Sequence, residues 1–254
     1  MSIEIYRFVE RCKNEFMLFM GIDKMPNFEI IPIKISKSQA DSRGYGVIAR
    51  QLYDVTNGNQ KLEIWEDLYK PQLNGKYLVF HELTHMLDAE KYSQCNKIKN
   101  VANKGYTEYH AAQVDLLCLL GAKSFTEDIN FSMQQEIDTS SGRKKVIDYV
   151  LSGIRTAKSL IARQDFPADV ATLATTLGLI FNFWGRSSIC KMYAMDYQEY
   201  SEAFNDMAEI KNFFGDTTYQ LLCSLAQGRL DDIQVMLMDK VYLNMIIEKS
   251  KGLS

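Results

Sequence analysis

Segments that favour β-strands are confined to the first third of this chain, and this asymmetry constrains the fold more than any other feature. Three such segments occur, at residues 27–35, 46–55 and 61–66. The Asn57-Gly58 pair between the second and third predicts a hairpin turn, and Pro32 predicts an edge position or a bulge for the first. Beyond residue 125 only helical patterns remain. The sequence therefore predicts an α+β fold with a small N-terminal mixed sheet and an all-helical C-terminal half.

Apolar residues at helical spacing place most of the chain in helices. The apolar stripe that begins at Ile5 predicts a helix over residues 3–20, and Gly21 is placed to end it. Further helices are predicted at residues 76–91, 106–120, 143–164, 168–185, 197–213, 216–228 and 231–249. We therefore expect a mixed domain over residues 1–125 and a helical region over residues 126–254 that packs on it.

Composition and charge exclude several kinds of partner. The net charge is −3, so no general electrostatic attraction to nucleic acid or to acidic membranes is expected. The longest apolar run, residues 170–184, is interrupted by threonines and by Asn182, which favours a buried helix over a membrane span. The five cysteines lack C-x-x-C spacing and favour free thiols in a reducing compartment. Because no secretory signal is visible, we expect a soluble, cytoplasmic protein.

The sequence His-Glu-Leu-Thr-His at residues 81–85 carries the chemistry. A helix turns by about 100° per residue, so His81 and His85 lie about 40° apart on one face. Both imidazoles can then reach a single metal ion, and Glu82 lies beside them, where it can take a proton from a water molecule bound at the metal. A chance match or a buried structural pair of histidines is the alternative. The position inside a long helix-forming stretch, after a predicted hairpin, favours a metal site.

A catalytic zinc ion needs a third protein ligand and an open position for water. The extended motif that supplies a third histidine is absent, because Lys91 stands where that histidine would be. Glu108 is the leading candidate, since it begins the predicted helix that follows His85 by 23 residues. Ala111 and Ala112 lie one turn further on and would let two helices approach closely. The alternative for Glu108 is a solvated charge in the first turn of a helix.

An H-E-x-x-H helix followed by a helix with E-x-x-A resembles the gluzincin metallopeptidases. Within them the chain is most similar to the compact minigluzincins, which include the ImmA/IrrE-type intracellular peptidases, and the resemblance covers roughly residues 27–123. It implies that His81, His85 and Glu108 bind Zn²⁺ and that Glu82 is the general base. It also implies that an edge strand ahead of the active-site helix aligns an extended substrate.

Asp88 lies on the same helix face as His81 and His85, at i+7 and i+3. It is interpreted as a carboxylate that orients one of these histidines, although it could instead replace Glu108 as a metal ligand. The remaining alternative is a solvated or helix-capping charge.

Three further side chains near Glu108 could stabilise an oxyanion or support the ligands: His110, Tyr106 and Tyr109. For His110 the alternative is an ordinary surface histidine, and for the two tyrosines it is packing. Asp115 lies two turns after Glu108 on the same helix face and is either a support for a ligand or simply a polar position.

The expected function is zinc-dependent hydrolysis of peptide bonds in a peptide or protein substrate. Residues 61–66 would be the strand that aligns the substrate by adding it to the sheet edge. The alternative is a zinc-stabilised regulatory or binding protein of the same fold, whose C-terminal helices recognise a protein partner. The intact Glu82 favours the enzyme, because a structural site needs the ligands but not the base.

Overall fold

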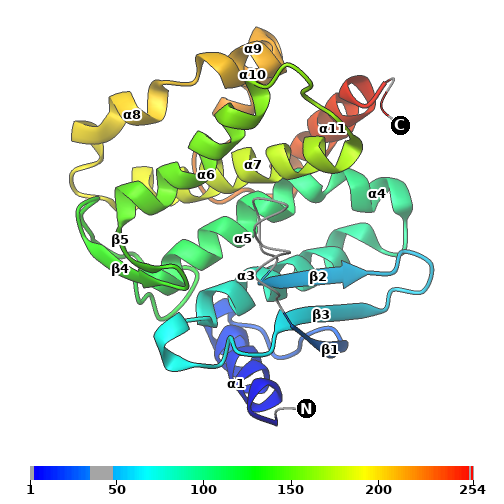
Figure 1. Cartoon of the computed structure of the whole chain (residues 1–254), viewed down its shortest axis with the longest axis vertical. Coiled ribbons are helices and arrows are strands. Elements are labelled where there is room, and N and C mark those ends of the chain that lie inside the picture. The colour runs from blue at the N-terminus through cyan, green and yellow to red at the C-terminus, as the bar shows by residue number, and fades with distance from the viewer. Residues whose placement is uncertain (1–2, 35–47, 252, 254) are drawn as a thin grey trace. The chain divides into compact units, whose positions relative to one another are not determined.

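A computed structural model describes residues 3–34, 48–251 and 253 (Figure 1). They form two compact units, one within residues 1–100, 114–127 and 137–143, and the other within residues 101–113, 128–136 and 144–254. Helix α5 (Lys104–Leu119) belongs to both units, since its first part up to Gln113 groups with the second and its remainder with the first. The predicted boundary near residue 125 therefore does not account for residues 101–113.

The first unit is built on α1 (Ile3–Met20), a small mixed sheet and α3 (Lys76–Asp88), which continues into a π-helical turn, η2 (Ala89–Ser93). The short 3₁₀ turn η1 (Pro71–Leu73) precedes α3, and α4 (Lys97–Ala102) follows η2. Both α1 and the start of α3 were predicted within a few residues, because each has a strong apolar stripe and a clear breaker. In particular, Gly21 ends α1 with a left-handed φ of 66°.

The sheet has the strand order β1-β3-β2. It contains β1 (Phe28–Ile33), β2 (Ala49–Tyr53) and β3 (Gln60–Trp65). Strand β1 runs parallel to β3 and β2 runs antiparallel to it, so β3 is the central strand (Figure 1). The predicted hairpin turn and the edge position of Pro32 are confirmed. The interpretation of residues 61–66 as the substrate-aligning edge is wrong, because Leu62 and Ile64 are fully buried and both sides of β3 are paired. The predicted strand residues 46, 47 and 35 lie outside the described residues.

Aromatic packing holds α3 against α1. The ring of Phe80 lies edge-on to that of Phe16, with centroids 5.3 Å apart, and it contacts Phe19 at 5.5 Å. Phe16 and Phe80 are almost completely buried. Gly75 is the N-cap residue of α3, and only glycine fits there because a Cβ would collide with the side chain of Leu68. The helix that carries the histidines is therefore fixed at its start and along one face.

The prediction that strands are absent beyond residue 125 is wrong. Strands β4 (Glu136–Thr139) and β5 (Gly142–Lys145) form a two-stranded hairpin. Its strands are only four residues long and largely charged, and Ile137 and Thr139 are their only β-branched residues, so the strand signal in the sequence is weak. Gly142, with φ 100°, follows the turn. The C-terminal half is otherwise helical in the described residues.

The second unit consists of helices packed around aromatic side chains. They are α6 (Val146–Ile161), α7 (Val170–Tyr193), the 3₁₀ turn η3 (Tyr197–Tyr200), α8 (Ser201–Asn205), α9 (Ala208–Phe214), α10 (Asp216–Leu225) and α11 (Asp232–Lys249). Asp169 caps α7 by accepting a hydrogen bond from the Thr172 amide. The helix predicted over residues 197–213 is wrong as one element, because Asp206 leaves the helical conformation at ψ 76° and separates α8 from α9.

Two glycines let the first part of α5 pack tightly within the second unit. A Cβ at Gly185 of α7 would lie 2.1 Å from the carbonyl oxygen of Tyr109. A Cβ at Gly105 of α5 would lie 2.6 Å from the ring of Tyr242. Such distances are below any real Cβ contact, so only glycine allows these approaches.

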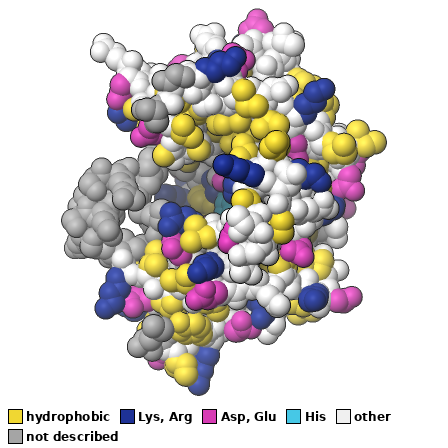
Figure 2. Space-filling model, turned by 90° about the vertical axis from the view of Figure 1, so that its right-hand side faces the viewer, with side chains coloured by type: hydrophobic (Ala, Val, Ile, Leu, Met, Phe, Trp, Pro, Cys, Tyr) yellow, Lys and Arg dark blue, Asp and Glu magenta, His cyan; other side chains and the backbone are white. Residues whose placement is uncertain are grey.

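Charged side chains of both signs are mixed on the surface. On the face shown in Figure 2, lysine and arginine side chains lie among aspartate and glutamate side chains. Some of them pair, as Lys61 does with Glu29 at 3.2 Å and Lys158 with Asp206 at 3.0 Å. Among the described helices, none combines the length and hydrophobicity that crossing a bilayer requires. The apolar run over residues 170–184 forms part of α7, as the sequence predicted.

Candidate metal centre

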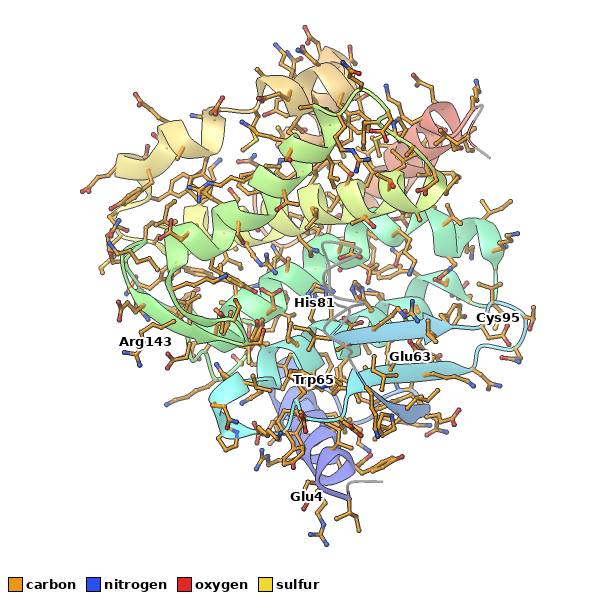
Figure 3. The ribbon with its side chains drawn as sticks, viewed as in Figure 1. Glu4, Glu63, Trp65, His81, Cys95 and Arg143 are labelled. Carbon is orange, nitrogen blue, oxygen red and sulfur yellow. The ribbon has the colours of Figure 1, made fainter. Side chains whose placement is uncertain are left out.

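Helix α3 brings His81 and His85 together as the spacing predicts. Their rings lie nearly perpendicular, at 81°, with centroids 4.7 Å apart. His81, labelled in Figure 3, has 13% of its side chain exposed, whereas His85 is buried. Nitrogen Nδ1 of His81 lies 3.1 Å from Oδ2 of Asp115, a carboxylate in the last part of α5 that is almost fully buried. A carboxylate accepts only, so this bond places the proton on Nδ1 and leaves the lone pair of Nε2 for a metal ion.

Glu82, the next residue on α3, is bonded to the sheet edge. Its Oε2 accepts a 2.7 Å hydrogen bond from the backbone N–H of Gln51 on β2. The Gln51 side chain donates to Gln60 at 3.0 Å, and Gln60 in turn donates to the carbonyl of Met86 at 3.0 Å. These bonds fix the edge strand β2 against α3 and orient the carboxylate of Glu82.

Glu108 lies in the first part of α5 and is half-buried. Its Oε2 accepts a 2.9 Å hydrogen bond from Nδ2 of Asn182 on α7. Burial, and after it the negative charge of Glu108, raise the pKa of the Tyr242 hydroxyl. Glu108 is therefore not the solvated charge that the sequence left as an alternative.

One ligand atom from each of His81, His85 and Glu108 lies within 4.8 Å of the other two. Bonds of about 2.0–2.1 Å to a tetrahedral zinc ion would set such atoms about 3.3 Å apart. The three described side chains thus offer ligand atoms that could hold one metal ion. Two imidazole nitrogens and a carboxylate oxygen suit Zn²⁺ and other first-row divalent ions as well. The residues present fit a metal ion, and the identity of that ion is a separate question.

The other candidate residues from the sequence, Asp88, His110 and Tyr109, are all buried. Asp88 is only 3% exposed, so it is not a solvated charge, and it does not belong to the group of ligand atoms. His110 is also buried and stacks on Tyr106 at 5.4 Å, which excludes an ordinary surface histidine. The Tyr109 hydroxyl donates to the carbonyl of Gly228. Its proton is thus engaged within the second unit.

The sequence does not predict a functional role for two residues that contact the site, Asn182 and Gln51. Asn182 could have been noticed in the sequence, because it is a polar residue inside an otherwise apolar stretch of helix. Gln51 could not have been noticed, because its bond to Glu82 uses a backbone N–H that every residue except proline possesses. Asp115 was left open between two readings, and its bond to His81 favours the role of support for a ligand.

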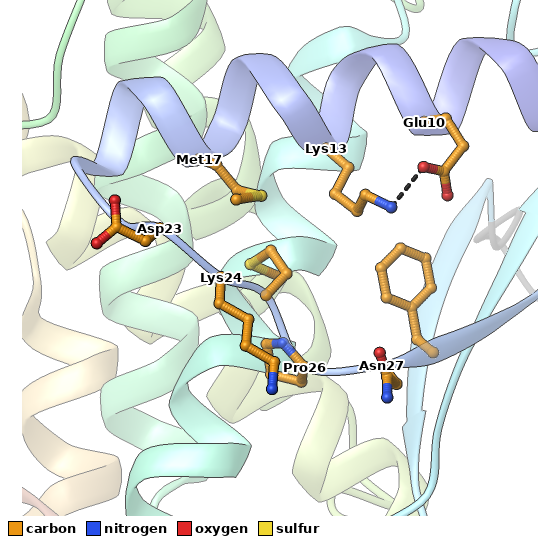
Figure 4. A pocket seen from close by; sticks show the side chains of 9 residues that line it. Glu10, Lys13, Met17, Asp23, Lys24, Pro26 and Asn27 are labelled. Atoms are coloured by element: carbon orange, nitrogen blue, oxygen red, sulfur yellow. Dashed lines mark hydrogen bonds and ion pairs between the residues drawn. The ribbon is translucent and has the colours of Figure 1, made fainter.

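A separate hollow of about 460 Å³ lies in the first unit between α1 and the start of β1 (Figure 4). Lys13 and Glu10 pair within it, and Asp23 and Lys24 line its other end. Its lining contains carboxylates and ammonium groups but no histidine. It therefore does not provide the ligand set found on α3 and α5.

Comparison of the chain with protein-family models, with curated proteins and with solved structures found no match.

Proposed function

We propose that this protein is a zinc-dependent metallopeptidase that hydrolyses peptide bonds in a peptide or protein substrate. The observation that supports the proposal best is the group formed by His81, His85 and Glu108, with Glu82 next to His81 on the same helix. Two histidines and a carboxylate leave a fourth tetrahedral position for water, as a catalytic zinc site requires.

Glu82 would act as the general base. When bound, Zn²⁺ supplies Lewis-acid polarisation of the scissile carbonyl and of water. The Glu82 carboxylate accepts the proton of the attacking water and then delivers it to the leaving amine. The backbone N–H of Gln51 would hold Oε2 of Glu82 in place by its hydrogen bond. The carboxylate of Asp115 would keep the imidazole proton of His81 on Nδ1.

The edge of β2 that faces away from β3 is the place we propose for the substrate backbone. The carbonyl of Ile48, just before β2, accepts a hydrogen bond from the backbone N–H of Trp65 on β3, whereas the backbone N–H of Gln51 points away from β3 and donates to Glu82. Residues 49, 51 and 53 thus share the outward side of the strand. An extended peptide added along this side would run past the Glu82 carboxylate.

Metal analysis of four purified proteins tests the site. Wild type and Glu82→Gln should retain zinc at about one ion per chain, Glu108→Ala should lose it, and Asp88→Ala should keep it. Loss of zinc from Asp88→Ala alone would make Asp88 the third ligand. Wild-type protein that binds no divalent ion would overturn the proposal.

Cleavage of a peptide library tests the activity. Zinc-loaded wild type should cut library peptides, and zinc-loaded Glu82→Gln should not, because an amide cannot accept the proton of water. Turnover by metal-loaded Glu82→Gln would overturn the role of this residue. Zinc binding without any cleavage, in the library or in a co-purifying protein, would support a regulatory module instead.

A further inference from the structure

We propose that Asn182 of α7 is a positioning residue for the metal ligand Glu108, and that it sets which carboxylate oxygen meets the ion. This inference rests on the proposed function, since it takes Glu108 as a ligand. Nδ2 of Asn182 donates to Oε2 of Glu108 at 2.9 Å. The bond engages Oε2 and leaves Oε1 for a metal ion, so Glu108 would bind through one oxygen.

The orientation of the Asn182 amide follows from the charge of Glu108. With the amide turned over, its carbonyl oxygen would face the carboxylate, and two acceptors would repel each other. An ionised Glu108 therefore fixes the NH₂ group toward itself. An ionised carboxylate is also the form that binds a metal ion.

The other polar atom of the Asn182 amide adds no hydrogen bond within the described part of the fold. Its Oδ1 is buried and has no hydrogen-bond partner among the described residues. A buried acceptor without a partner lowers stability, and an apolar side chain of the same size would avoid this loss. The surrounding stretch of α7 is apolar, so the hydrogen bond from Nδ2 to Glu108 is what the polar side chain contributes at this position.

Gly178, one turn before Asn182 on α7, leaves room for the Glu108 carboxylate. A Cβ at Gly178 would lie 3.5 Å from Oε1 and 3.6 Å from the carboxyl carbon. The carboxylate thus lies over the surface of α7 between Gly178 and Asn182. The helix supplies both the space for Glu108 and the donor that orients it.

Zinc titration of Asn182→Leu, with a chromophoric competitor chelator, tests the proposal. The zinc Kd should rise about 10- to 100-fold, as is typical when a residue that orients a ligand is lost. The melting temperature of the metal-free protein is measured beside it, because leucine removes the unpartnered Oδ1 but also the donor to the Glu108 carboxylate. Ser188→Ala is the matched control, because Ser188 is a buried polar residue of α7 that bonds to Gln113 and not to Glu108. Its zinc Kd should equal that of wild type.

A double-mutant cycle shows whether Asn182 acts through Glu108. In a Glu108→Ala background, Asn182→Leu should leave the remaining zinc affinity unchanged. Asn182→Asp, which replaces the donor with a carboxylate, should weaken zinc binding at least as much as leucine does, and it decides the matter if Asn182→Leu does not fold.

The outcomes separate this inference from the proposed function. Wild type that binds no zinc, or Glu108→Ala that binds it as wild type does, overturns the ligand set itself. If both controls behave as expected and the Asn182 variants keep the wild-type zinc Kd, the positioning role alone is overturned. A lowered melting temperature with an unchanged Kd would likewise assign Asn182 to packing.

Discussion

The backbone N–H of Gln51 donates a 2.7 Å hydrogen bond to Oε2 of Glu82, and this bond joins an edge strand to the helix that carries His81 and His85. Gln51 is paired with Leu62 in the β2–β3 ladder, but its backbone N–H points away from β3 and toward Glu82. A hydrogen bond between an amide and a charged carboxylate is stronger than one between neutral groups. The same contact orients the proposed base and stabilises the sheet edge.

Replacing Glu82 should therefore have two separable effects on stability. Glu82→Gln keeps a carbonyl oxygen that can accept from the Gln51 amide, so its free energy of unfolding should stay close to that of wild type. Glu82→Ala loses the acceptor and should be less stable by about 1–3 kcal/mol. Urea unfolding of the metal-free proteins measures the difference. Equal stability of the alanine variant and wild type would show that the bond contributes nothing.

Asp115 should control zinc affinity through His81. In Asp115→Asn the new amide can donate to Nδ1 of His81, which moves the imidazole proton to Nε2, the nitrogen needed for the metal. We expect the zinc Kd to rise about 10- to 100-fold. Asp88→Asn is measured beside it, because Asp88 is the other buried carboxylate that the sequence offers as a support for a histidine. A larger loss of affinity in Asp88→Asn than in Asp115→Asn would reverse the assignment.

Local patterns predicted the parts of the fold that depend on neighbouring residues. Helix α3, the Asn57-Gly58 turn and the end of α1 at Gly21 all follow from spacing or from one residue's backbone preference. The order of the strands does not, because the parallel pairing of β1 with β3 joins segments separated by a hairpin. Hence β3 was expected at the edge and lies in the centre.

In the candidate site, too, contacts within one helix could be predicted and contacts between distant segments could not. His81, Glu82 and His85 share one helix, so their mutual placement was predictable from a 100° turn per residue. Glu108 could be named only as the leading candidate for the third ligand, since a second helix carries it and spacing does not fix how two helices approach each other. Asn182 lies 74 residues further along the chain, and no local pattern connects it with Glu108.

Gly185 should be the position on α7 least tolerant of a methyl group. Its Cβ would meet a backbone oxygen, that of Tyr109, at 2.1 Å, so α5 and α7 would have to separate. We expect Gly185→Ala to lower the free energy of unfolding by at least about 1–3 kcal/mol. Gly153→Ala in α6 is the matched control, because its nearest neighbours would lie 3.7 Å away. Alanine is the better helix former, so this variant should be more stable by about 0.5–1 kcal/mol. Urea unfolding that ranks the two variants the other way would contradict this account of the packing.

Asp196 should make the second unit sensitive to acid. Its Oδ2 accepts from the Ser132 hydroxyl at 2.6 Å, and its Oδ1 accepts from the Met133 amide at 2.9 Å. Burial opposes ionisation, but these two donors favour the carboxylate more strongly, so the pKa of Asp196 is lowered. A lowered pKa in the folded state means that the stabilisation is complete above the unfolded pKa of about 4 and is lost as the pH falls through the folded pKa.

The comparison of wild type with Asp196→Asn measures this contribution. At pH 7 the asparagine variant should unfold at a lower urea concentration, because an amide oxygen accepts more weakly than a carboxylate. As the pH falls below about 4, Asp196 takes up a proton, and the difference between the two urea midpoints should shrink. Ser132→Ala removes one donor to Asp196, so in this background the urea midpoints of the proteins with and without Asp196→Asn should lie closer together at pH 7. Midpoints that stay equally far apart from pH 7 to pH 2.5 would show that the two hydrogen bonds do not depend on the charge of Asp196.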